Sequence, residues 1–209
     1  MWHVMADTST RTIDLSHPIV DGMVTYPGLP VPTIADHLTR EAAESVYGPG
    51  VTFQIGLITM CTNTGTYLDV PFHRFADGHD LAGLDLARVA AVPAVCLDRR
   101  GVRAIGVSRS ELEGRAGYAV LFRTDHAVHF GTERYAVEHP HLTAESAAVL
   151  AEANVAVVGI DSLNIDDTND PQRPVHTTLL RACIPIVEHL TGLGGTFPVR
   201  AYATIPRSR

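Results

Sequence analysis

Short apolar runs recur through the second half of the chain, and their length is typical of buried β-strands. The clearest run covers residues 155–160, where a continuous apolar stretch between turn residues favours a strand covered on both faces. Residues 51–61 alternate apolar and polar side chains instead, which predicts a strand with one solvated face. The strands expected from these patterns are 12–16, 51–61, 94–97, 119–122, 155–160 and 198–205.

Helix signals lie between these runs. Thr143 is a suitable N-cap for a helix that continues through 145–152. Ser108 and Glu111 have the spacing of a capping box, which predicts the start of a shorter helix, and residues 176–183 are also predicted to be helical. Strands and helices interleave without a strict strand–helix–strand order, so we predict an α/β domain with mixed β-sheets flanked by helices.

Two segments in the first quarter of the chain follow neither period. Residues 18–32 contain repeated prolines and glycines, which predicts a long irregular loop that docks on a surface and does not build a core. This loop is expected to run away from the core or toward a partner subunit, in a homodimer or homotetramer. Residues 36–50 are polar and are expected to be partly helical, and they could act as a lid.

The chain length bounds the domain organisation. With 209 residues the chain is long enough for one domain with a substantial core. We predict a flexible N-terminus at residues 1–10 and a single domain at 11–209. No repeat or low-complexity segment argues for a further division.

Composition narrows the class of partner. The formal net charge of −7 argues against nucleic acid or an anionic membrane as a partner. No apolar run has the length of a membrane span, and residues 1–10 lack the pattern of a signal peptide. The three cysteines are scattered and odd in number, which favours a reducing cytoplasm over a disulfide framework. We therefore expect a cytoplasmic protein that acts on a small-molecule substrate.

The densest group of chemically capable side chains lies at residues 63–73. Gly65 can form a tight turn that brings both flanks together, and Tyr67 and Asp69 would share one face of an extended segment. Asp69 and His73 carry groups that bind metals or move protons. A capped turn with a surface histidine would show the same residues, so the spacing alone leaves both interpretations open.

A second candidate pair is formed by His176 and Glu188. Both side chains are preferred ligands of zinc and manganese. Glu188 follows the apolar run 184–187, and a carboxylate at the end of such a run needs a partner. The alternative to a metal site is that His176 is a packed side chain and that Glu188 is an isolated carboxylate.

Other polar clusters are explained equally well by loops and turns. Asp125, His126 and His129 follow the expected strand 119–122, and loops at strand ends commonly carry site residues, but a surface loop explains them too. Aspartates after the next expected strand would bond the backbone within turns. These turn aspartates are Asp161, Asp166 and Asp167, and the histidines expected at the surface are His79, His139 and His141.

A series of motifs runs in a fixed order along nearly the whole chain. The motifs are Asp14-Leu15-Ser16-His17-Pro18-Ile19, Leu121-Phe122-Arg123-Thr124, Leu142-Thr143-Ala144-Glu145, Gly159-Ile160-Asp161-Ser162-Leu163, His176 with Glu188, and Pro198-Val199-Arg200-Ala201. In this order they resemble the cyclase family, which includes bacterial kynurenine formamidase (arylformamidase) and isatin hydrolase. The resemblance implies a swivelling β/β/α-like domain.

The site motif of that family is His-x-Gly-Thr-His-x-Asp-x-Pro-x-His. Residues 63–73 match it except at two positions, because Asn63 and Tyr67 replace the first two histidines. In the formamidases these two histidines, the aspartate, and a distant histidine and glutamate hold a pair of zinc ions. A carboxamide is a weak metal ligand, and a phenol binds well only when ionised. The resemblance therefore implies the loss of one metal position in this chain.

The remaining motif positions can be carried over one by one. The resemblance implies that Asp69, His176 and Glu188 hold at most one divalent metal, zinc or manganese, which would act on a carbonyl. His73 keeps the acid/base position, and Tyr67 is expected to donate a hydrogen bond to the substrate. The residues expected to contact the substrate are Asn63, Tyr26, His17 and Phe72.

Three functions fit these residues. The first is a metal-assisted hydrolase that opens an amide, lactam or ester of a small cyclic or aromatic substrate, and it acts on carbon–nitrogen bonds other than peptide bonds. The second is a metal-independent cyclase, dehydratase or lyase of a biosynthetic pathway, with His73 and Tyr67 as acid and base. The third is a non-catalytic binder of small molecules on an inherited fold. The retained ligand set favours the hydrolase.

Overall fold

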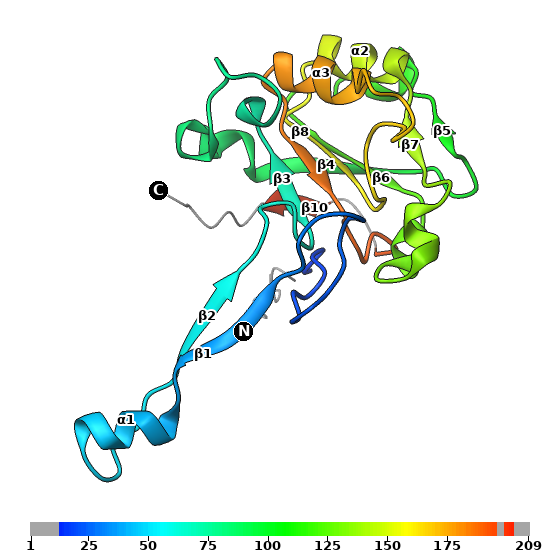
Figure 1. Cartoon of the computed structure of the whole chain (residues 1–209). Helices are drawn as coiled ribbons and strands as arrows, with labels where there is room; N and C mark the ends of the chain where they lie inside the picture. The colour runs from blue at the N-terminus through cyan, green and yellow to red at the C-terminus, as the bar shows by residue number, and fades with distance from the viewer. Residues whose placement is uncertain (1–12, 196–198, 203–209) are drawn as a thin grey trace, which may run out of the picture.

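A six-stranded β-sheet forms the body of the molecule in the computed structural model, which describes residues 13–195 and 199–202 (Figure 1). Its strands are β3 (Tyr67–Asp69), β4 (Ala90–Asp98), β6 (Ala119–Arg123), β8 (Val157–Ile160), β9 (Ile186–Glu188) and β10 (Val199–Tyr202). They follow the order β10-β4-β6-β8-β9-β3. The four inner strands are parallel, and β10 and β3 pair antiparallel at the two edges. The predicted mixed sheet of an α/β fold is confirmed.

Two helices cover one face of this sheet, namely α2 (Ala144–Glu152) and α3 (Pro174–Arg181), which pack against each other (Figure 1). Phe122 of β6 and Ile160 of β8 are fully buried in one cluster with Leu150 and Leu179 of the helices. The central strands are apolar at nearly every position because a parallel sheet is covered on both faces. This core fixes the strand ends and α3, which carry the site described below.

Loops and short 3₁₀ helices cover the opposite face of the sheet. There Leu121 packs with Leu190 and Leu193, and Val157 packs in a second cluster with Val70. A small parallel pair, β5 (Ala104–Ile105) and β7 (His141–Leu142), lies beside the main sheet. The 3₁₀ helices are η1 (Pro71–His73), η2 (Leu81–Gly83), η3 (Leu86–Arg88), η4 (Arg109–Leu112), η5 (His126–His129) and η6 (Glu133–Ala136).

An arm, residues 33–59, projects away from the body (Figure 1). It consists of β1 (Thr33–Leu38), α1 (Arg40–Tyr47) and β2 (Ile55–Thr59), with the two strands antiparallel. All five residues of β2 are exposed. A two-stranded sheet without a covering layer is only marginally stable alone, and the arm presents apolar side chains that the other described residues do not cover.

Several predicted elements are confirmed with small shifts in their bounds. Thr143 caps α2 through the amide of Ser146, and the capping box of Ser108 and Glu111 begins η4. The helix predicted at 176–183 is α3, which begins earlier because a proline can occupy the first turn of a helix. The partly helical segment 36–50 contains α1.

Two strand predictions need correction. Residues 13–16 have no regular secondary structure, because Asp14 accepts a local hydrogen bond from the amide of Ser16, which competes with strand pairing. The strand expected at 51–61 is limited to β2 and is exposed on both faces. Residues 1–10 and parts of the expected strand 198–205 lie outside the described residues. Among the described helices, none is long and apolar enough to cross a membrane.

Candidate active site

A pocket of about 300 Å³ lies where the end of β9 meets the start of β3. This volume is at the small end of ligand sites and fits a molecule with a single ring. The pocket contains acidic, basic, amide and aromatic side chains, so it differs from an ordinary packing defect. Its lining residues are Tyr26, Leu29, Asn63, Tyr67, His73, Arg74, Asn164, Arg173, His176 and Glu188.

Strand pairing places the first site residues. Tyr67 of β3 is paired with Glu188 of β9, and side chains two apart on a strand project to the same face, so Asp69 joins them. Pro71 then begins η1, and the amide of His73 donates to the carbonyl of Val70 at 2.8 Å. This turn brings the His73 imidazole back beside the Asp69 carboxylate.

Asp69, His176 and Glu188 converge, although more than a hundred residues separate the first from the other two. His176 Nε2 lies 3.6 Å from Asp69 Oδ2 and 3.6 Å from Glu188 Oε1. Two ligands of a tetrahedral ion at about 2.1 Å lie about 3.4 Å apart. Asp69 Oδ2 is buried and has no hydrogen-bond partner among the described residues. A buried carboxylate oxygen needs such a partner, and a divalent cation held between Asp69 Oδ2 and His176 Nε2 would supply one.

Asp166 fixes the orientation of His176. Its carboxylate accepts the Nδ1–H of His176 at 2.7 Å and the amides of Val175 and His176 at 2.7 and 3.0 Å. With Nδ1 acting as the donor, Nε2 is the nitrogen directed at Asp69 and Glu188, and its lone pair would bind a metal that displaces its proton. A histidine held by a carboxylate in this way is typical of metal ligands, because the carboxylate sets the tautomer and raises the basicity of the ring.

The electrostatic environment of His176 also favours a cation. Burial by itself lowers the pKa of His176, but the hydrogen bonds to Asp166 and Asp69 and the charge of Glu188 raise it to about 10. The raised pKa reflects an excess of negative charge around Nε2. The same field stabilises a divalent metal at this position.

Three groups hold the fully buried Glu188 carboxylate. The Tyr67 hydroxyl donates to Oε2 at 2.5 Å, and the amide of Ile165 donates to Oε1 at 2.7 Å. The side-chain amide of Asn164 lies 3.4 Å from Oε2. Burial raises the pKa of Glu188, and the charge of Asp69 adds to the rise, while these hydrogen bonds favour the charged form. Oε1 remains the oxygen that faces His176.

The Tyr67 hydroxyl therefore has a different hydrogen-bond partner from the one that the sequence predicts. Burial raises the pKa of its phenol well above 10, and the charges of Glu188 and Asp69 raise it further. The residue stays a neutral phenol, which is a poor metal ligand. Its hydroxyl donates to Glu188, whereas the sequence predicts a hydrogen bond to the substrate.

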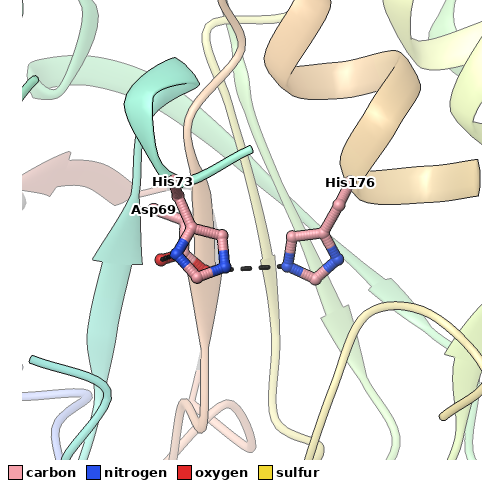
Figure 2. A group of neighbouring side chains, drawn as sticks. All are labelled: Asp69, His73 and His176. Atoms are coloured by element: carbon pink, nitrogen blue, oxygen red, sulfur yellow. Dashed lines mark ion pairs between the residues drawn. The ribbon is translucent and has the colours of Figure 1, made fainter. Parts of the chain in front are cut away.

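His73 lies opposite His176 across the site. Its Nδ1 is 3.3 Å from Asp69 Oδ1, and the two imidazole centres are 5.8 Å apart with planes inclined by 37°. Figure 2 shows the rings facing each other, with the Asp69 carboxylate beside His73. The His73 side chain is 43% exposed, against 7% for His176, so it can exchange protons with solvent. Asp69, His73 and His176 each offer a ligand atom within 4.8 Å of the others.

Comparison with known proteins is decisive for the family. Residues 13–167 match the family model described as "Putative cyclase". The chain belongs to the cyclase family. Over 185 residues it is 30% identical to kynurenine formamidase of Bacillus cereus and to that of Bacillus mycoides, and each match covers 87% of this chain and 83% of the relative.

Solved structures share the fold of this cyclase-family chain. Isatin hydrolase A from Ralstonia solanacearum has a TM-score of 0.70 at 22% identity, covering 90% of this chain and 82% of that chain. A potential metal-dependent hydrolase with cyclase activity has a TM-score of 0.66 at 24% identity, covering 85% and 80%. At these identities the likeness establishes a common fold.

Two residues that were predicted to contact the substrate lie elsewhere. Phe72 is 59% exposed and does not line the pocket. Successive side chains in a 3₁₀ helix are about 120° apart, so Phe72 cannot share the direction of His73. His17 is also outside the pocket lining, because its ring stacks on Phe130 at a centroid distance of 3.7 Å. Tyr26 and Asn63 do line the pocket, as predicted.

Four residues of the site were missed by sequence reasoning. Asp166 was expected to be a turn residue, yet it supports His176. The signal that could have found it is the need of a ligating histidine for an acceptor at its second nitrogen, although no fixed spacing points to the acceptor. Asn164, Arg74 and Arg173 carry no motif of their own, and only the fold brings them to the pocket.

The other histidine and aspartate clusters are structural. Asp161 is buried and accepts hydrogen bonds from Thr124 and from the amide of Asp125. His126 pairs with the carbonyl of Tyr135. The expectation that His139 is at the surface was wrong, because this residue is only 3% exposed.

Proposed function

We propose that this chain is a hydrolase that uses one divalent metal to cleave a carbon–nitrogen bond, other than a peptide bond, in a small cyclic or aromatic substrate. The observation that carries the proposal is that His176, held by Asp166, is directed at the carboxylates of Asp69 and Glu188. Kynurenine formamidases at 30% identity support an amide substrate. One structure of the same fold is described as a potential metal-dependent hydrolase.

Asp69, His176 and Glu188 are the proposed metal ligands. Two carboxylates and one imidazole suit zinc or manganese, and a three-residue set leaves a position open as in catalytic sites. When bound, the metal supplies Lewis-acid polarisation of the substrate carbonyl and activation of water. Asn63 and Tyr67 offer no strong ligand for a second ion, so we propose one metal per chain.

His73 is the proposed proton carrier. It combines solvent access with a carboxylate neighbour, Asp69, at 3.3 Å. The carboxylate orients the ring, and a positioned imidazole transfers protons well near neutral pH. In amide cleavage the departing nitrogen needs a proton, and His73 is placed in the pocket lining to deliver it.

Tyr67 takes a supporting role in this proposal. Its hydroxyl donates to Glu188 Oε2, so it holds the carboxylate whose other oxygen faces His176. The metal-independent alternative, with His73 and Tyr67 as acid and base, receives less support from this geometry. A buried phenol with a raised pKa is a poor proton donor at neutral pH.

We also propose that the chain assembles as a homodimer or homotetramer through the arm. Exposed apolar side chains gather on the arm as well as on the loop 18–32, which is the contact that the sequence predicts. Exposed apolar patches of this kind mark protein interfaces. The exposed residues of the arm include Ile34, Val46, Tyr47, Phe53, Ile55, Leu57 and Ile58.

The state of the cysteines fits the proposed cytoplasmic location. Cys61, Cys96 and Cys183 are all free thiols. Free thiols persist in reducing compartments, whereas exported proteins of this size commonly pair theirs.

Hydrolysis assays test the proposed function. Metal-loaded enzyme is expected to release formate from N-formylkynurenine or to open the ring of isatin. His176→Ala should abolish this activity, while His129→Ala, a histidine outside the pocket, should retain it. If the metal-loaded wild-type enzyme hydrolyses neither compound, the proposed hydrolase function is contradicted.

A further inference from the structure

Two arginines line the reaction pocket without a carboxylate partner. Arg74 directly follows η1, and Arg173 directly precedes α3. Within the described ranges, neither guanidinium forms an ion pair, although six other arginines do. Both guanidinium groups are therefore available to an anionic ligand, and both line the pocket that also contains His73 and His176.

Each guanidinium is anchored by one hydrogen bond, that of Arg74 at the first turn of α3 and that of Arg173 in the loop before this helix. Arg74 Nε donates to Thr177 Oγ1 at 3.3 Å, and Arg173 Nη1 donates to the carbonyl of Asp167 at 3.1 Å. The amide of Thr177 in turn donates to the carbonyl of Arg173 at 3.0 Å. His176 belongs to the same turn. A guanidinium has five N–H donors, so one anchoring bond positions each group and leaves most of its donors for a ligand.

Arg173 adopts a backbone conformation that is unfavourable for its residue type. Its φ of 48° and ψ of 59° lie in the left-handed region, and its side chain makes no capping bond to α3. Glycine or asparagine would adopt this conformation at lower cost. Residues held in such conformations cluster at functional sites, which agrees with a binding role for this side chain.

The charge balance of the pocket favours an anion. Asp69 and Glu188 carry the negative charges that the proposed metal would neutralise. Arg74 and Arg173 are then the uncompensated charges, and guanidinium groups match the geometry of a carboxylate. Tyr26 and Leu29 supply an apolar part of the lining, so the pocket combines a surface for a ring with a cationic anchor.

We propose that the substrate is an aryl amide or fused lactam that bears a carboxylate, and that Arg74 and Arg173 bind this carboxylate. The inference rests on the proposed function and specifies its substrate class. Anchoring the carboxylate beside the first turn of α3 places the scissile carbonyl toward His176, and such positioning lowers the barrier by fixing the reacting geometry. A pocket of about 300 Å³ leaves room for one ring and its two substituents.

A matched pair of substrates tests this inference. We expect 2-formamidobenzoate to be hydrolysed with a kcat/KM about 10–100-fold above that of the neutral isostere 2-formamidobenzamide. Arg74→Gln and Arg173→Gln should each remove much of this difference between the two substrates. Arg134→Gln is the control, because this arginine lies on η6 outside the pocket, and it should preserve the difference.

Equilibrium binding of the two amine products separates this inference from the proposed function. Calorimetry of the metal-loaded enzyme should show tighter binding of 2-aminobenzoate than of 2-aminobenzamide, and the double variant Arg74→Gln/Arg173→Gln should bind both equally. If neither amide is hydrolysed, the proposed hydrolase function is wrong. The difference in affinity between the two amine products still tests the anion site. Equal binding of both products by wild type, or a preference that survives in the double variant, would overturn the inference.

Discussion

Tyr67 and Glu188 face each other across β3 and β9, and the Tyr67 hydroxyl donates to Glu188 Oε2 at 2.5 Å. The family motif has a metal-binding histidine at the position of Tyr67. Here the Tyr67 side chain supports Glu188, which is one of the proposed ligands, and does not replace a ligand. A fully buried carboxylate without donors would be costly, so this contact favours the charged form of Glu188, whose Oε1 faces His176.

Tyr67→Phe tests this supporting role. The variant removes the donor to Glu188 Oε2 without changing the size of the ring. We expect metal affinity to fall by about 10–100-fold, the usual effect of removing a group that orients a ligand. Competition with a chromogenic chelator measures the metal affinity of the variant and of the wild type. A variant that binds metal as tightly as wild type but turns over slowly would instead place the hydroxyl on the substrate.

Asp166→Asn tests how His176 is held. The amide cannot accept the Nδ1–H with the strength of a carboxylate, so the tautomer that directs Nε2 at the ligand site is less favoured. Metal affinity is expected to fall by about 10–100-fold, measured by the same competition. Asp167→Asn is the matched control, because Asp167 bonds only Asn169 with its side chain. Equal effects of both substitutions would contradict the assignment.

His73→Ala separates proton transfer from metal binding. The loss of one positioned acid/base group lowers turnover by about 10²–10⁴-fold. Metal content should stay near the wild-type level, because Asp69, His176 and Glu188 remain. Elemental analysis and steady-state kinetics of the same preparation give both quantities. If the variant loses the metal together with the activity, His73 is a metal ligand and not only a proton carrier.

The sequence predicted the parts of the fold that depend on local pattern. β6 and β8 are buried on both faces, as their apolar runs indicated. The cap at Thr143 is present because its side chain needs only the amide of Ser146, three residues on. The site residues Asp69, His176 and Glu188 were expected together from the family resemblance, and the pairing of β3 with β9 brings two of them to one place.

Long-range geometry limited the remaining predictions. Phe72 is next to His73 in sequence, but a 3₁₀ turn directs it elsewhere. Asp166 resembles a turn residue in the sequence, and only the hydrogen bonds that it accepts from Val175 and His176 of α3 make it a partner of this helix. The sequence predicts the arm as a polar segment and a strand, but the arm projects from the body and no layer of the described ranges covers β2.

Light scattering tests the proposed assembly. The wild-type chain is expected to have the mass of a dimer or tetramer at micromolar concentration, because the arm exposes Leu57 and its apolar neighbours. Leu57→Asp should shift the mass toward the monomer by burying a charge in the interface. Val128→Asp is the control, since Val128 is 75% exposed and lies outside the arm. A monomeric wild-type mass would contradict the proposal.

The number of divalent metal ions per chain tests the central claim most directly. Protein stripped with a chelator is titrated with zinc or manganese, and metal content and hydrolytic activity are measured at each step. The ligand set of Asp69, His176 and Glu188 predicts saturation near one ion per chain, with activity rising in proportion to occupancy. Saturation near two ions, or full activity in the metal-free protein, would contradict the account.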